Sequence, residues 1–118
     1  MIHLDIEQID GVPIVYLKED LDAANAATVE RGLAEAIGPD ALSLIVDLSS
    51  VRYLDSAGID MLLRLSDRLD RRRNELILVV PESSQLKRLV TIVGLPDAIA
   101  IHPSLHEALA GQRSGGQS

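Results

Sequence analysis

The chain has 118 residues, of which 47% are hydrophobic and 25% charged, and it contains no cysteine. These figures predict one compact domain that buries roughly two-thirds of its unfolded surface, with no disulfide, thiolate metal site or cysteine nucleophile. The formal net charge is -7 and the only aromatic residues are two tyrosines, which argues against a nucleic-acid binder, because such proteins need a basic face or base-stacking rings.

The sequence offers no segment suited to crossing a membrane. Its longest fully apolar run, Leu76–Val80, is far shorter than the ~20 residues of a membrane helix. Residues Met1–Asp5 lack the basic region and apolar stretch that begin a secretion signal. We therefore expect a cytoplasmic protein that does not insert into membranes.

The N-terminal part of the chain predicts a β-hairpin. Ile2, Leu4 and Ile6 alternate with polar residues, as in a strand with one face in water. The dipeptide Asp10-Gly11 is a signal for a tight turn, and a second strand over Val12–Leu17 follows it. This hairpin is the antiparallel pair that we expect in the fold.

After the hairpin, helices alternate with apolar strands. The helices are expected to begin at Asp22 as an N-cap, at Ser56, at Ser83 or Ser84, and at the capping box Ser104-Leu105-His106-Glu107. The strands between them are expected at Leu42–Val46, Leu76–Val80 and Ala98–Ile101. The order β-β-α-β-α-β-α-β-α predicts an α/β domain with a mostly parallel five-stranded sheet, because strands joined through helices run parallel. The domain is expected to span residues 1–110, and the polar, glycine-rich residues 111–118 are expected to form a flexible tail.

The second helix is predicted to run from about Ser56 to Arg73. Its inward face is expected to consist of Ile59, Leu62, Leu63 and Leu69. Its outer face is expected to carry ion pairs at i,i+4 spacing, Asp60 with Arg64 and Asp67 with Arg71. The run Arg71-Arg72-Arg73 ends this helix, where positive charge is favoured, so we interpret it as a solvated helix end and not as a nucleic-acid site.

Functional residues of such a sheet gather in the loops beyond the carboxyl ends of its strands. The loops in this position are Asp20–Asp22, Ser49–Ser56 and Pro81–Ser84. In the middle loop, Asp55 and Ser56 place a carboxylate and a hydroxyl at the start of a helix, and Gly58 follows in its first turn. A glycine there costs up to ~1 kcal/mol relative to alanine, which indicates that another group approaches closely.

Two interpretations of Asp55-Ser56-Ala57-Gly58 compete on spacing alone. One is an N-cap, worth about 1 kcal/mol and without further function, and spacing alone favours it. The other is a phosphorylation site at Ser56, where a phosphate would add close to two negative charges beside Asp55.

The segment Asp47-Leu48-Ser49-Ser50-Val51-Arg52-Tyr53-Leu54-Asp55-Ser56-Ala57-Gly58-Ile59 closely resembles the hallmark of STAS domains, specifically of the bacterial anti-sigma factor antagonists. Their pattern is Asp-Leu-Ser, a short apolar stretch, and then Asp-Ser-Ser/Ala-Gly-Leu/Ile. Weaker similarity extends over residues 2–110, through Leu17–Asp22 and Leu89–Leu109. The chain departs from the pattern at Glu19, where the family usually has glycine, and we expect this change to affect that loop or the choice of partner.

The resemblance implies a regulatory switch that is not an enzyme and needs no cofactor. In that family the unmodified antagonist binds a kinase-type anti-sigma factor and so frees the sigma factor. The kinase uses its own ATP to phosphorylate the motif serine, and the modified antagonist is released. On this sequence Ser56 would be the phosphoacceptor, and a reversible switch also needs a phosphatase that acts on Ser56. The residues that the resemblance assigns to partner binding are Asp22, Asp55, Ser56, Ala57, Gly58 and Ile59.

Other functions fit the residues less well. A serine hydrolase needs Gly-x-Ser-x-Gly around its nucleophile, which Ser56 lacks. Asp47 ends an apolar strand as in receiver domains, but no acidic pair follows the first strands to hold Mg²⁺. His102 and His106 have no third metal ligand. One alternative stays open: a constitutive STAS subunit or scaffold, in a stress-signalling complex or on a lipid-transport ABC ATPase, that contacts its partner without phosphorylation.

Overall fold

A five-stranded sheet organises the molecule. The computed structural model describes residues 4–115. Its strands are β1 (Asp5–Ile9), β2 (Val12–Tyr16), β3 (Ser43–Asp47), β4 (Glu75–Val79) and β5 (Ala100–His102). They lie side by side in chain order, with β1 antiparallel to β2 and all other neighbours parallel. The predicted α/β fold with one antiparallel hairpin is confirmed.

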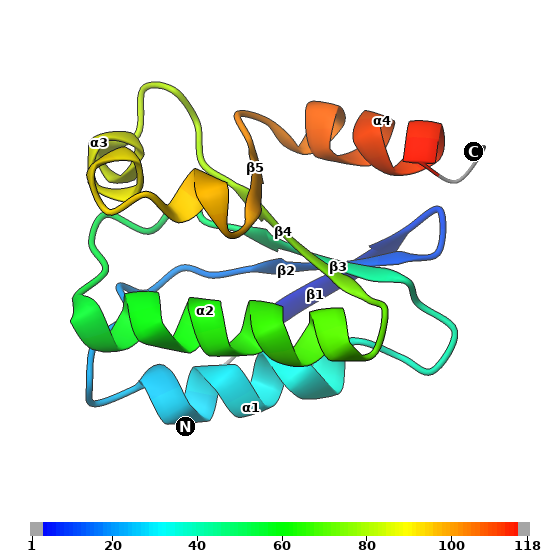
Figure 1. Ribbon diagram of the computed structural model, residues 1–118, viewed down its shortest axis with the longest axis horizontal. Coiled ribbons are helices and arrows are strands. Elements are labelled where there is room, and N and C mark those ends of the chain that lie inside the picture. Colours follow the sequence, from blue (N-terminus) through cyan, green and yellow to red (C-terminus); the bar gives the residue numbers. More distant parts are fainter. Residues whose placement is uncertain (1–3, 116–118) are drawn as a thin grey trace.

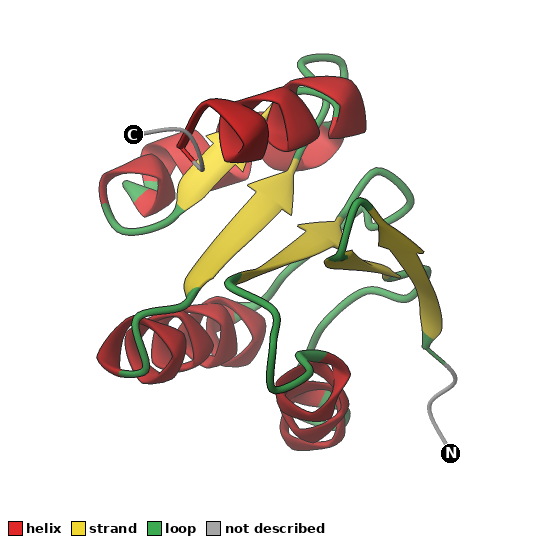
Figure 2. Ribbon diagram, turned by 90° about the vertical axis from the view of Figure 1, so that its right-hand side faces the viewer, coloured by secondary structure: helices red, strands yellow, loops and turns green. Residues whose placement is uncertain are grey.

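Helices cover both faces of the sheet. They are α1 (Ala26–Ala36), α2 (Ser56–Arg71), α3 (Gln85–Ile92) and α4 (Leu105–Gly115), with a short 3₁₀ turn at Leu95–Asp97. Helices α1 and α2 lie side by side on one face, α4 lies on the other, and α3 sits toward one end of the sheet (Figures 1 and 2). None of the helices in residues 4–115 is long and apolar enough to cross a membrane.

The hydrophobic core has two parts because the strand side chains alternate between the faces. The larger cluster lies between the sheet and helices α1, α2 and α3, and it includes Val15, Leu44, Val46 and Leu78. The smaller cluster lies on the α4 side and consists of Ile14, Ile45, Ile77, Val79 and Ala108. Strands buried on both faces must be apolar throughout, which explains the near-continuous apolar runs of β3 and β4.

The hairpin turn has the backbone geometry that its sequence predicts. Asp10 has φ 52° and Gly11 has φ 79°, and two successive left-handed residues form the turn type that suits the twist of a β-hairpin. Pro13, the second residue of β2, lacks a backbone N–H, but β2 pairs with β3 only from Ile14 onward. The proline is therefore compatible with a strand that lies inside the sheet.

The first strand lies further along the chain than its alternation predicts. Ile6, expected to face the core, is 51% exposed, and Ile2 lies outside the described residues. Leu4 packs against the core, with its side chain beside Gly32 of α1. The difference arises because β1 is an edge strand. Ile6 lies two residues beyond Leu4, where no helix covers the sheet.

Helix α2 buries a slightly different stripe from the predicted one. Leu62 and Leu69 are buried as expected, and Ile59 is partly buried, but Leu63 is 37% exposed. Met61 and Leu65 take its place in the core. The buried residues follow i, i+3 and i+4 steps that continue from Gly58, which rotates Leu63 to the margin of the face.

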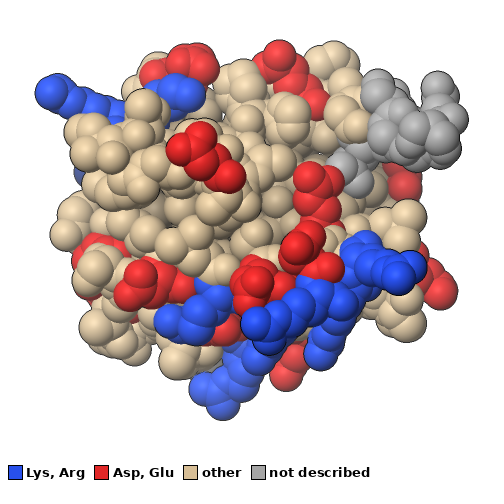
Figure 3. Space-filling view, viewed as in Figure 1, with Lys and Arg blue, Asp and Glu red and all other residues tan. Residues whose placement is uncertain are grey.

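The ion pairs of α2 depend on its neighbour α1. Asp67 and Arg71 pair at 3.0 Å as predicted, whereas Arg64 pairs with Glu30 of α1 at 2.9 Å and not with Asp60. Packing of the two helices side by side brings Glu30 within reach. On the face in Figure 3, most of the visible Lys and Arg side chains gather over these helices with acidic residues among them, so no uniformly basic surface forms there.

Helix α4 is longer than predicted. It begins at the expected capping box, where the Glu107 N–H donates to Ser104 Oγ at 3.1 Å. It then continues to Gly115, so residues 111–115 are helical where the sequence predicted a flexible tail. Gln112 and Arg113 have good helix propensity and extend a helix already held against the sheet by Ala108.

Tyr16 on β2 is expected to titrate at unusually high pH. Its hydroxyl donates to Glu7 Oε1 at 2.6 Å, and this bond, then burial, then the charges of Glu7 and Asp47 raise its pKa from 10.0 to about 12. Because the fold favours the protonated phenol, this stabilisation is complete below pH 10 and is lost as the pH rises toward 12. In a Tyr53→Phe background, where Tyr16 is the single tyrosine, absorbance titration should give a midpoint near 12. Glu7→Ala should lower that midpoint, and an unchanged value would contradict this explanation.

Candidate functional site

Two loops that follow β2 and β3 are joined by backbone pairing. Leu21, in the loop before α1, forms a parallel bridge with Leu54, in the loop before α2. The Leu21 N–H donates to the Tyr53 carbonyl at 3.2 Å, and the Asp55 N–H donates to the Leu21 carbonyl at 3.1 Å. The side chains of Leu21 and Leu54 are fully buried, so backbone hydrogen bonds and burial of apolar side chains both stabilise the bridge.

Asp20 strengthens the same junction with its side chain. Its Oδ1 accepts hydrogen bonds from the backbone N–H groups of Arg52, at 2.9 Å, and Tyr53, at 3.2 Å. Bonds from backbone N–H groups to a carboxylate are stronger than bonds between neutral groups. The sequence does not predict this role, because its one signal is a carboxylate in a loop at the carboxyl edge of the sheet.

Asp55 is the N-cap of α2. Its Oδ1 accepts a hydrogen bond from the Gly58 N–H at 3.0 Å, and its backbone is extended. Ser56, the first residue of the helix, is exposed. Within the described part of the chain the Ser56 hydroxyl has no hydrogen-bond partner. The Asp55 carboxylate therefore serves as the N-cap of α2. The Ser56 hydroxyl is not needed for capping and is exposed at the surface.

Gly58 is buried, and the group that approaches it belongs to the same chain. A Cβ atom at this position would lie 2.8 Å from Leu21 Cβ and 3.0 Å from the Leu21 carbonyl oxygen. Real Cβ atoms do not come this close to their neighbours. The close approach expected from the sequence is therefore the Leu21–Leu54 bridge seated on the first turn of α2.

Asp22 shapes the turn that precedes α1, but it is not the N-cap predicted from the sequence. Its Oδ1 accepts from the N–H groups of Ala24, at 2.9 Å, and Asn25, at 3.2 Å. The helix itself begins at Ala26, with Asn25 at the N-cap position. A turn over residues 22–25 separates Asp22 from the helix. Asp22 nevertheless lies near Ser56, because the preceding residue, Leu21, is hydrogen-bonded to Asp55.

Glu19 and Asp47 flank this edge. Glu19 is exposed and does not have the left-handed backbone that would favour glycine, so the loop accommodates the departure from the family pattern without strain. Asp47 Oδ1 accepts from the Ser49 N–H at 2.8 Å and from the Ser49 hydroxyl. The Asp47 carboxylate therefore stabilises the turn at Ser49 that follows β3.

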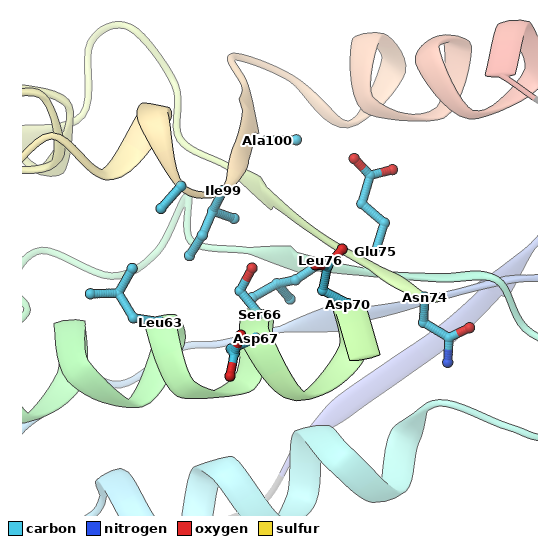
Figure 4. Close-up of a pocket in the computed structure, with 10 residues that line it drawn as sticks. Leu63, Ser66, Asp67, Asp70, Asn74, Glu75, Leu76, Ile99 and Ala100 are labelled. Carbon is cyan, nitrogen blue, oxygen red and sulfur yellow. The ribbon is translucent and has the colours of Figure 1, made fainter. Parts of the chain in front are cut away.

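Two hollows in the described part of the chain do not include Ser56. One, of about 310 Å³, lies beside the far half of α2 and is lined by Ser66, Asp67 and Asp70 together with the start of β4 and the segment before β5 (Figure 4). At 1.5 Å per residue, Asp70 is about 20 Å along the helix axis from Ser56. Within residues 4–115 no group of three His, Cys, Asp or Glu side chains is arranged to hold a metal ion. The exposed Ser56 therefore lies away from both hollows.

Comparison with known proteins identifies the family. The STAS domain model matches residues 3–108, nearly the whole chain. The protein is a member of the STAS domain family. Two relatives are similar to it over most of both chains. The anti-sigma-F factor antagonist RsfB of Mycobacterium tuberculosis is 28% identical over 106 residues, covering 90% of this chain and 85% of that protein. The anti-sigma-B factor antagonist of Listeria monocytogenes is 32% identical over 97 residues, covering 82% and 81%.

Solved structures agree with this assignment. The unphosphorylated form of the anti-sigma factor antagonist SpoIIAA superposes with a TM-score of 0.66 at 16% identity, covering 96% of this chain and 99% of that one. The phosphorylated form of SpoIIAA, from Bacillus, gives a TM-score of 0.64 at 17% identity, covering 92% and 97%. At these identities the likeness establishes the shared fold. The relatives named here are regulatory proteins, and no catalytic family is indicated.

Replacing Gly58 should disturb the junction of the two loops. In Gly58→Ala the gain in helix propensity, about 1 kcal/mol, is opposed by a clash with Leu21 whose relief costs about 1–3 kcal/mol or more. We expect a net loss of stability in urea denaturation. Gly38→Ala is the matched control, because a Cβ there meets nothing within 4 Å, and it should change stability by less than about 0.5 kcal/mol. Equal effects of the two substitutions would contradict the packing argument.

Proposed function

We propose that the protein is an anti-sigma factor antagonist whose unphosphorylated form binds a kinase-type anti-sigma factor in the cytoplasm and is switched off by phosphorylation of Ser56. One observation carries the proposal: Ser56 is exposed and unbonded within the described residues, while the adjacent Asp55 caps the helix. The names of the relatives supply the class of partner.

Phosphorylation at this position is compatible with the fold. The γ-phosphoryl group of ATP would pass to Ser56 Oγ, the hydroxyl proton would leave to a base of the kinase, and ADP would be released. The product phosphate would stand at the N-terminus of α2, where the helix dipole favours negative charge. Because Asp55 keeps the capping bond to Gly58, the helix does not depend on the hydroxyl that is modified.

The same phosphate would change the surface that a partner meets. It would add up to two negative charges beside Asp55 and near Asp22. A partner fitted to the neutral hydroxyl would then face like-charge repulsion and the cost of desolvating a phosphate. A phosphatase acting on Ser56 would restore binding and complete the cycle.

The proposed contact residues differ in accessibility. Asp22 and Ser56 are exposed, Asp55, Ala57 and Ile59 are partly buried, and Gly58 is buried. We assign direct contact to the first two groups. Gly58 contributes by admitting Leu21, as the distances above indicate, and so by setting the position of its neighbours.

Substitutions at Ser56 test the switch. Affinity capture from a lysate of the source organism should compare the wild-type chain with Ser56→Ala and Ser56→Asp, with mass spectrometry of the captured proteins and of Ser56. We expect an ATP-binding anti-sigma factor kinase on the wild type and on Ser56→Ala, and at least a tenfold smaller amount on Ser56→Asp. The purified kinase with ATP should then phosphorylate the wild type at Ser56.

A charge control separates position from net charge. Ser50 is exposed on the same loop, so Ser50→Asp adds the same charge six residues earlier in the chain, and it should retain the kinase. Thermal unfolding should show that Ser56→Asp remains folded. Retention of one partner by all variants, such as a transport ATPase or a large scaffold, would overturn the switch and support a constitutive STAS subunit.

A further inference from the structure

Tyr53 is a large exposed side chain at the Ser56 edge. It is 55% exposed, whereas Leu21 and Leu54, the apolar residues of the bridge beside it, are buried. It precedes Ser56 by three residues. Within the described residues, the other tyrosine, Tyr16, donates its hydroxyl to Glu7, but the Tyr53 hydroxyl has no partner. An exposed ring with an unused hydroxyl is the kind of side chain that dominates protein–protein interfaces.

The backbone of Tyr53 is fixed on both sides. Its N–H donates to Asp20 Oδ1 at 3.2 Å, and its carbonyl accepts from the Leu21 N–H at 3.2 Å. The next residue, Leu54, is buried in the bridge. A side chain on a fixed backbone loses less conformational entropy on binding than one on a mobile loop. The geometry thus presents the ring in a set direction.

Asp20 is the residue that connects Tyr53 to the rest of the fold. Its carboxylate reaches residues that are 32 and 33 positions away in the chain, Arg52 and Tyr53. Its own carbonyl accepts from Asn25 Nδ2 at 2.9 Å, so Asp20 is held in turn from the start of α1. Loss of the carboxylate would release two N–H groups of the loop that carries Tyr53.

We propose that Tyr53 is an aromatic anchor for the protein that reads Ser56, and that Asp20 is a positioning residue that holds Tyr53 where that partner meets it. This inference rests on the proposed function, since it places the partner of Ser56 on Tyr53 as well. The interface then has two components on one loop: a hydroxyl whose phosphorylation turns binding off, and a ring that supplies affinity in the unmodified state.

Binding measurements on the full chain test the anchor. The probe is the purified protein that the wild-type chain captures in the experiment described above, and the readout is its dissociation constant by calorimetry. Tyr53→Ala should weaken binding about tenfold or more, with no change in thermal stability. Leu42→Ala is the control, because Leu42 is 76% exposed and immediately precedes β3, at the opposite end of that strand from the Ser56 loop. This variant should bind like the wild type. Wild-type affinity of Tyr53→Ala would overturn the inference.

A double-mutant cycle tests the role of Asp20. If Asp20 acts through Tyr53, Asp20→Ala should weaken binding by itself, and the double variant should bind no more weakly than Tyr53→Ala. Losses that simply add would show that Asp20 acts independently and would overturn its assignment. Asp20→Asn keeps an acceptor oxygen and should restore most of the affinity, which general destabilisation of the fold would not explain.

Amide hydrogen exchange supplies a readout that needs no partner. Asp20→Ala should raise the exchange rates of the Arg52 and Tyr53 amides about tenfold or more, because these N–H groups lose their acceptor, while amides of β3 and β4 keep their protection. Unchanged rates would contradict the positioning role.

The two proposals fail in different ways in the same assay. Wild-type affinity of Ser56→Asp would overturn the phosphorylation switch but would leave the Tyr53 comparison readable. Wild-type affinity of Tyr53→Ala would overturn the anchor but would leave the switch in place.

Discussion

The site depends on the bridge between Leu21 and Leu54, which is possible only because residue 58 has no side chain. The bridge extends the pairing of β2 and β3 past the ends of both strands and ties the two loops into one unit. Burial of two leucine side chains, each worth roughly 1.5–3 kcal/mol, outweighs the cost of about 1 kcal/mol for a glycine in a helix. Without this contact the two loops would lose their backbone pairing, and Tyr53 would be held to the loop before α1 only through the Asp20 carboxylate.

The fold could be predicted from the sequence because its signals are local. The Asp10-Gly11 turn, the Ser104 capping box and the apolar runs of β3 and β4 each specify their own element, and all of them agree with one α/β topology. The structure differs from the sequence prediction where contacts between elements determine which side chains are buried or paired. Leu63 and Ile6 are apolar and have the spacing of core residues, but no helix or strand covers them. Arg64 forms its ion pair with Glu30 of α1 and not with Asp60 of its own helix.

The site was predictable in part, for the same reason. Asp55, Ser56 and Gly58 follow a helix-start pattern within four residues, so spacing and family resemblance both identify them. The partner of Gly58 was not predictable, since Leu21 is remote in sequence and nothing in its own surroundings indicates the contact. The role of Asp20 is not predictable because a lone carboxylate in a loop carries no pattern, although its two bonds to Arg52 and Tyr53 join residues more than 30 positions apart in the chain.

The separation of roles between Asp55 and Ser56 has a consequence for the lifetime of the protein in a cell. Proteases act on the transiently unfolded fraction of a chain, which depends on its free energy of unfolding. Because the helix is capped by a neighbour of the exposed serine, the proposed phosphorylation would break no capping bond, and the helix dipole favours the added charge, so the unfolded fraction should not rise. The phosphorylated chain should then be degraded no faster than the unmodified one, and selective loss of the phosphorylated form would not lower its share.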